Sequence, residues 1–166
     1  MTTSLATQRR NTHEVNVFHG PVGFYDDLQT VLVDLIELQL QAKQAHWNVV
    51  GTNFRDLHLQ LDTIVDAARA ASDAIAERVR ALDAVPDARS DTVAATTSVP
   101  AIPAGLLDAT EAADMISNRI YAVVSTMRAV HDGVDAVDPS TADLLQAIID
   151  RLEKEAWLLK SENGIA

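Results

Sequence analysis

Apolar residues recur at helical spacing near the start of the chain. Between positions 24 and 49 they stand three or four residues apart, at Phe24, Leu28, Val31, Leu35, Leu38 and Ala42. This spacing puts them on one face of a helix and leaves the opposite face polar. We therefore predict a long helix over about residues 24–49, which Gly51 is expected to end.

A second helix and a long connection are predicted next. Asn53 can cap the helix, which continues to about residue 82, and Pro86 prevents any extension beyond that point. The segment 84–104, AVPDARSDTVAATTSVPAIPA, is too long for a tight turn. We expect it to cross the molecule and to contain a short helix around residues 92–96.

Two further helices follow this connection. One is predicted over about residues 106–132, because Asp108 and Glu111 are spaced like a capping box and Gly133 is expected to close the helix. The other is predicted over about residues 138–162. It begins with Asp138 as the cap and Pro139 in the first helical position.

This order of elements indicates the fold. Two antiparallel helical hairpins joined by one long crossover define a ferritin-like four-helix bundle, whereas an up-down-up-down bundle needs only a short link after its second helix. We predict an all-α protein with a single domain over residues 21–166. Residues 1–20 are expected to form a flexible arm, because they are polar, aperiodic and end in Gly and Pro.

Composition and charge narrow the chemistry. The chain has no cysteine, so disulfides and thiolate metal ligands are excluded. Its formal net charge of −11 repels nucleic acid and attracts cations. No apolar run approaches the length of a membrane span and no signal-peptide pattern opens the chain, so we expect no membrane partner and a cytoplasmic location.

Polar residues form a stripe on the second predicted helix, where a core-facing helix would be apolar. His58 and Asp62 are four residues apart, as are Asp73 and Glu77, and the eleven residues between Asp62 and Asp73 make close to three turns. His46 and His58 stand equally far from the centre of the preceding turn. An antiparallel hairpin therefore brings these two imidazoles to the same height.

One chain cannot place both pairs of the stripe on one ion. The centres of the pairs are about 22 Å apart along the helix, whereas metal–ligand bonds measure about 2–2.5 Å. Either the pairs are unrelated, or two copies of this helix cross antiparallel about a two-fold axis. Imidazole and carboxylate without thiolate suit iron, manganese or zinc. The chain contains no Glu-x-x-His, which argues against an ordinary di-iron centre inside the bundle.

Three segments resemble the signature of a known family. KQAHWNVVGTNF, LHLQLD and ASDAIAERV are similar to the corresponding segments of the Dps mini-ferritins, the DNA-binding proteins from starved cells. The match is close over residues 28–82 and looser over PSTADLLQAIIDRLEKEAWLLKSE near the C-terminus. The resemblance implies an iron site with His46, His58 and Asp62 from one subunit and Asp73 and Glu77 from its two-fold mate.

The resemblance also implies an assembly and an activity. Dps proteins form hollow dodecamers of 23 symmetry that act as ferroxidases: they oxidise Fe(II) with hydrogen peroxide or dioxygen, store the ferric mineral and so protect DNA. Trp47 matches a family tryptophan beside the iron site, where it would act in catalysis. Asp138 and Asp143 fall near the positions that line iron-entry pores in relatives.

The alternative is a nucleoid-associated protein whose main task is to bind and condense DNA. Relatives that bind DNA directly use a basic flexible tail, and the N-terminal arm of this chain offers Arg9 and Arg10. Two charges per chain are weak alone. Several arms on one particle can act together through multivalency, against the repulsion of the acidic body.

Overall fold

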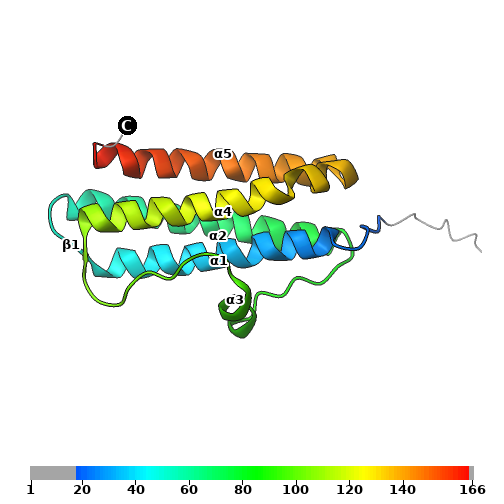
Figure 1. Ribbon diagram of the computed structural model, residues 1–166, viewed down its shortest axis with the longest axis horizontal. Coiled ribbons are helices and arrows are strands. Elements are labelled where there is room, and N and C mark those ends of the chain that lie inside the picture. Colours follow the sequence, from blue (N-terminus) through cyan, green and yellow to red (C-terminus); the bar gives the residue numbers. More distant parts are fainter. Residues whose placement is uncertain (1–17, 165–166) are drawn as a thin grey trace, which may run out of the picture.

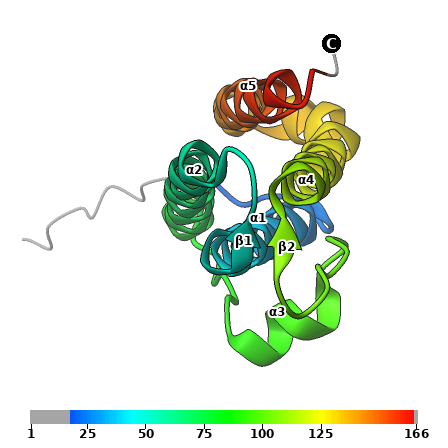
Figure 2. The ribbon, with the colours of Figure 1, turned by 90° about the vertical axis from the view of Figure 1, so that its left-hand side faces the viewer.

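The computed structural model describes residues 18–164, which form a bundle of four long helices (Figure 1). The long helices make two antiparallel hairpins, and the crossover between the hairpins carries a short helix. The helices are α1 (Phe24–Asn48), α2 (Phe54–Ala81), α3 (Ser90–Thr96), α4 (Ala109–Val137) and α5 (Pro139–Glu162). Seen end-on, the four long helices surround a common centre and α3 lies outside them (Figure 2). The predicted four-helix bundle with one long crossover is confirmed.

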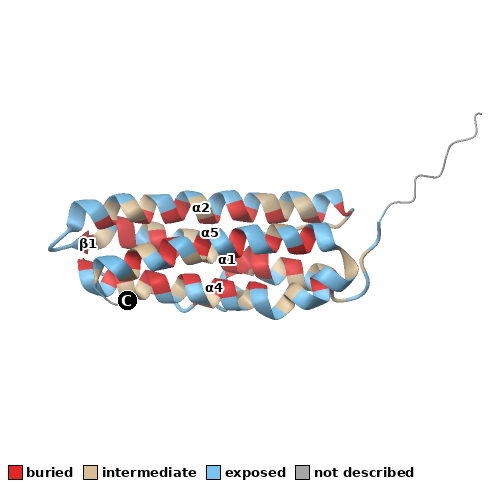
Figure 3. Cartoon of the chain, turned by 90° about the horizontal axis from the view of Figure 1, so that it is seen from above, coloured by how far each residue is buried: buried red, intermediate tan, exposed pale blue. Residues whose placement is uncertain are grey.

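The core is built almost entirely from aliphatic side chains. Each long helix presents a buried face to the centre and an exposed face to solvent, as Figure 3 shows. Leu28, Leu35 and Leu38 of α1 are fully buried, as the helical spacing predicted, and so are Leu61 and Ile64 of α2. Each such side chain contributes about 1.5–3 kcal/mol relative to an exposed one, so this packing provides most of the stability of the bundle.

Two short strands, which the sequence pattern did not predict, close one end of the bundle. β1 (Val49–Val50) pairs in parallel with β2 (Leu107–Asp108). Because residues 107 and 108 belong to β2, α4 begins at Ala109 and not at about residue 106 as predicted. The Asp108 side chain accepts a hydrogen bond from the Thr110 backbone N–H at the start of α4. Gly51 follows β1 with a φ of 107°, and a Cβ at this position would lie 3.1 Å from a carboxylate oxygen of Asp108. A glycine is therefore required there.

Three expectations about helix ends were wrong. Asp138 stands at the N-cap of α5, but its side chain makes no capping hydrogen bond. Gly133 does not close α4, which continues to Val137, because Val134 is fully buried and its packing keeps the last turn helical. Asn53 stands at the N-cap of α2 with a φ of 61°, but its side chain makes no capping hydrogen bond. Asn53 instead adopts the left-handed backbone conformation, which Asn tolerates, and so allows the tight turn between β1 and α2.

A buried carboxylate attaches the crossover to the bundle. Asp34 of α1 is fully buried and accepts hydrogen bonds from the Thr97 and Ser98 hydroxyls and from the Ser98 backbone N–H. Thr126 of α4 donates a further hydrogen bond to it. Four donors around one carboxylate replace the water that the charge loses on burial.

Within residues 18–164, no helix is both long enough and apolar enough to span a membrane. Arg9 and Arg10, and most of the predicted arm, lie outside the described residues.

Candidate metal centre

His46 and His58 meet at the closed end of the α1–α2 hairpin. Their rings are stacked, with centroids 3.7 Å apart and planes inclined by 23°. Nδ1 of His46 lies 2.9 Å from the carbonyl oxygen of His58, and Nδ1 of His58 lies 3.0 Å from the carbonyl oxygen of His46. The two residues thus bind each other's backbone, as their equal distance from the turn allows.

These two hydrogen bonds determine which ring nitrogen is available to a metal. A carbonyl oxygen can only accept, so each Nδ1 must carry the proton and donate it. In the neutral ring the lone pair then resides on Nε2, which is the atom able to bind a metal ion. The hairpin therefore holds two imidazoles in the tautomer that a metal centre needs.

Asp62 lies on α2 about one helical turn after His58. Its Oδ1 accepts a hydrogen bond of 2.5 Å from Lys43 Nζ and lies 3.3 Å from His46 Nδ1. The hydrogen bond from Lys43 lowers the pKa of Asp62 more than burial raises it, and the nearby imidazoles and the Lys43 charge lower it further. The carboxylate is therefore ionised at neutral pH, and Lys43 supplies the positive charge beside it.

Lys43 was not predicted as part of this group, although the sequence contains a signal for it. Lys43 and Asp62 stand nearly equally far from the centre of the turn, about which His46 and His58 are equidistant. Lys43 also lies beside Trp47, with its Nζ 5.9 Å from the ring centroid. The Trp47 side chain is 67% exposed in the single chain, so its indole is open to a neighbouring subunit or to solvent.

Asp73 and Glu77 lie toward the other end of α2, away from the two histidines. Both are exposed, and neither forms an ion pair with another described residue. Among residues 18–164, no three His, Asp or Glu side chains lie close enough to hold a metal ion. The five residues predicted as ligands therefore fall into two separate groups within one chain.

The two acidic residues predicted near the pore differ in their surroundings. Asp138, at the N-cap of α5, accepts a hydrogen bond of 2.5 Å from Arg78 and another from the Thr141 hydroxyl. Burial raises the pKa of Asp138, but these two hydrogen bonds, the charge of Arg78 and a smaller contribution from the Ser140 backbone N–H together outweigh it and lower the pKa. Asp143 is exposed on α5 and forms no such pair with a described residue. Arg78 thus neutralises Asp138 within the subunit and leaves Asp143 as the freer carboxylate.

The bundle topology and the imidazole–carboxylate group define the class of protein, a ferritin-like helical bundle with a candidate metal centre at one end. A family model for the ferritin-like domain matches residues 25–163. The DNA protection during starvation protein of Agrobacterium fabrum is 34% identical over 135 residues, which cover 81% of this chain and 83% of that protein.

Two further comparisons agree. DNA protection during starvation protein 2 of Deinococcus radiodurans is 36% identical over 134 residues, which cover 81% of this chain but only 56% of that longer protein. The structure of Dps from Microbacterium arborescens in the high iron form superimposes with a TM-score of 0.81 at 34% identity, covering 85% of this chain and 92% of that one. The chain therefore belongs to the Dps family of ferritin-like proteins.

Proposed function

We propose that this protein is a ferroxidase and iron-storage protein. It oxidises Fe(II) with hydrogen peroxide or dioxygen at sites shared between two subunits and stores the ferric product inside a hollow dodecamer. The observation that carries the proposal is the reciprocal pair of hydrogen bonds between His46 and His58, which leaves both Nε2 lone pairs available beside the ionised Asp62.

The second half of the site is supplied by another copy. Asp73 and Glu77 are exposed, have no cation of their own among the described residues, and share a helix stripe with His58 and Asp62. When two α2 helices cross antiparallel about a two-fold axis, the acidic pair of one copy faces the His58–Asp62 pair of the other, and two identical sites form. Each site then combines imidazole and carboxylate ligands, which suit iron.

The chemistry follows from the charges. Carboxylates stabilise Fe(III) more than Fe(II), which favours loss of an electron from the bound ion. Two Fe(II) ions give one electron each to a molecule of peroxide, whose O–O bond breaks and which takes up two protons to leave as two waters. Both reactants of hydroxyl-radical chemistry are removed in this step. That outcome agrees with the name DNA protection during starvation protein, which the relatives carry, and the high iron form of the Microbacterium protein supports iron as the metal.

Direct DNA binding remains the alternative function. It depends on Arg9 and Arg10, which lie outside the described residues, and it is opposed by the net charge of −11. Protection of DNA by iron removal requires neither residue. We therefore place oxidation and storage of iron first.

The proposal is tested by removing one carboxylate from each half of the site. We expect Asp62→Ala with Glu77→Ala to give a folded oligomer of unchanged size that oxidises Fe(II) at least about tenfold more slowly, because each shared site loses two of its three charged ligands. Ferric absorbance and peroxide consumption measure the rate, and Co(II) titration measures metal binding without oxidation.

Two exposed acids on α4 provide the matched control. Asp132→Ala with Asp135→Ala removes the same charge away from the α2 stripe and should leave both the rate and Co(II) binding unchanged. Undiminished oxidation in the Asp62/Glu77 variant would reject the site.

A further inference from the structure

Asp66 and Arg69 are charged residues at the middle of α2 to which the proposed iron site assigns no role. Both are exposed and lie three residues apart, a spacing that permits an ion pair within the helix. The ion pairs formed among residues 18–164 nevertheless include neither of them. Their charges therefore lack a partner in the described part of the subunit.

The surroundings of the two residues form a hollow on the outside of the α1–α2 hairpin. The hollow has a volume of about 660 Å³ and includes Leu32 and Ile36 of α1 together with Asp66, Arg69 and Asp73 of α2. The other α2 side chains that line the hollow are those of alanine and serine. Because these side chains are small, another helix can approach closely. The hollow thus combines apolar contact area, unpaired charges of both signs and a predicted iron ligand.

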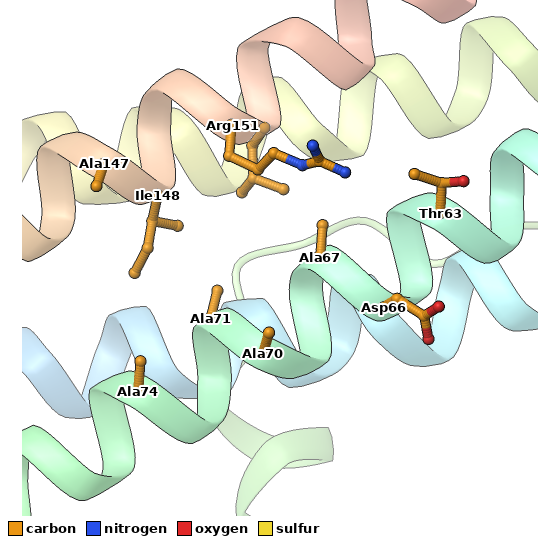
Figure 4. Close-up of a pocket in the computed structure, with 10 residues that line it drawn as sticks. Thr63, Asp66, Ala67, Ala70, Ala71, Ala74, Ala147, Ile148 and Arg151 are labelled. Carbon is orange, nitrogen blue, oxygen red and sulfur yellow. The ribbon is translucent and has the colours of Figure 1, made fainter.

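The opposite side of α2 offers Asp66 no cation within the described chain. A second hollow, of about 550 Å³, lies between α2 and α5, and alanines line most of its α2 side (Figure 4). Its basic residue, Arg151, is paired with the buried Glu155 at 2.9 Å. Arg151 is therefore already neutralised, so a cation that pairs with Asp66 would have to come from outside the described part of the subunit.

The register of the shared iron site places these charges opposite each other. His58 opposes Glu77, and Asp62 opposes Asp73, only when the two-fold axis passes midway between positions 67 and 68 of α2. Asp66 and Arg69 lie equally far from that midpoint, on either side of it. The axis that completes the iron site therefore also brings Asp66 of each copy to the height of Arg69 of the other.

We propose that Asp66 and Arg69 form two reciprocal ion pairs across this two-fold axis and select the register in which two α2 helices complete the iron site. The inference rests on the proposed function, because the register is that of the shared site. A guanidinium can bind a carboxylate through two parallel N–H groups, so each pair is directional as well as attractive.

The same two residues disfavour the neighbouring registers. A relative shift of three residues, about 4.5 Å or nearly one turn, puts Asp66 opposite Asp66 of the second copy in one direction and Arg69 opposite Arg69 in the other. Either shift therefore replaces two attractions with a repulsion at the axis, which penalises the incorrect alignment. A slip of this size would also separate the acidic residues of one copy from the histidines of the other.

Charge reversal tests the pairing in the full-length protein. Asp66→Arg places arginine against arginine twice in a homodimer, and Arg69→Asp places aspartate against aspartate twice. We expect each single variant to weaken dimer formation at least about tenfold, as measured by sedimentation velocity at low protein concentration, because two attractions become two repulsions. The double variant D66R/R69D should assemble like the wild type, since both pairs are restored with reversed polarity.

Mixing the two single variants gives a sharper result. In a mixed dimer one subunit carries arginine at both positions and the other carries aspartate at both, so both pairs across the axis are attractive. Native mass spectrometry should therefore find mixed dimers strongly preferred over either homodimer. A variant that merely failed to fold would not recover on mixing. Asp135→Arg, an equal charge reversal on α4, serves as the control and should assemble normally.

The outcomes separate this inference from the proposed function. Normal assembly of both single variants, a double variant as weak as the singles, or random mixing would each overturn the ion pairs, even if the wild type oxidises Fe(II). If the single, double and mixed variants assemble as expected but the wild type oxidises no Fe(II), the ion pairs are supported and the proposed function fails.

Discussion

Lys43 pairs with Asp62, so in the proposed site an incoming iron ion would have to displace this lysine. Its Nζ lies 2.5 Å from Asp62 Oδ1, where it neutralises the same carboxylate that would bind iron. The ammonium also lies near Trp47, so a displaced Lys43 can move over the indole face and remain stabilised by a cation–π contact. In the described chain, the ammonium of Lys43 therefore already occupies the carboxylate that the proposed iron site requires.

We expect Lys43→Met to bind Co(II) more tightly than the wild type. Both partners of the Lys43–Asp62 pair are partly exposed, so the ion pair contributes at most about 1 kcal/mol, and its loss should raise the affinity by no more than about fivefold. Isothermal titration calorimetry measures the change. Lys154→Met, which removes an exposed lysine of α5 that forms no described ion pair, should leave the affinity unchanged. An affinity that falls in Lys43→Met would mean that the lysine assists the metal site rather than competing with it.

Among the helices, α3 and the crossover around it depend on Asp34 for their position. The carboxylate joins α1, the crossover and α4 through hydroxyl and backbone donors, and its own side chain is fully buried. Local propensity cannot place a seven-residue helix outside a bundle, because an isolated helix of this length is marginal in water. The burial of Val93 in α3 and the hydrogen bonds of Asp34 just beyond its end supply the missing stabilisation.

Replacing Asp34 should therefore destabilise the fold and loosen the crossover. We expect Asp34→Ala to lower the free energy of unfolding by about 2–4 kcal/mol, because several buried donors lose a charged acceptor at once. Thr126→Val removes a single donor and should cost about 1 kcal/mol. Denaturant titration measures both values, and limited proteolysis should cut the Asp34 variant first within residues 84–104. Equal losses for the two variants would show that the network does not act through Asp34.

At the scale of the assembled protein, a mixing experiment can test whether two subunits share each site. In the proposed arrangement each site takes His58 from one copy and Asp73 from the other. A dimer of His58→Ala and Asp73→Ala subunits would then contain one doubly defective site and one intact site. Refolding an equal mixture should therefore recover about a quarter of the wild-type sites, given that half of randomly formed dimers are mixed. Fe(II) oxidation by the mixture, compared with each variant alone, measures this recovery. If the mixture is no more active than its components, the sites are not shared between chains.

Much of the fold could be predicted from the local pattern of apolar and polar residues. The apolar spacing of Leu28, Leu35 and Leu38 predicted a helix that the structure confirms, and the length of the segment 84–104 distinguished one long crossover from an up-down-up-down bundle. The equal distance of His46 and His58 from their turn predicted that the imidazoles would lie at the same height, and the structure brings the rings into a stack with centroids 3.7 Å apart. These features depend on neighbours in the chain, which is why periodicity and spacing reveal them.

The remaining features join residues that are far apart in the chain. Arg78 reaches Asp138 across 60 positions, Asp34 reaches Thr126 across 92, and β1 meets β2 only because the crossover returns to the same end of the bundle. Gly133, a stop signal by local rules, remains helical because Val134 is buried against the rest of the core. Such contacts exist only after the helices have packed. Their energy then outweighs local preference, and no pattern confined to a few neighbouring residues records it.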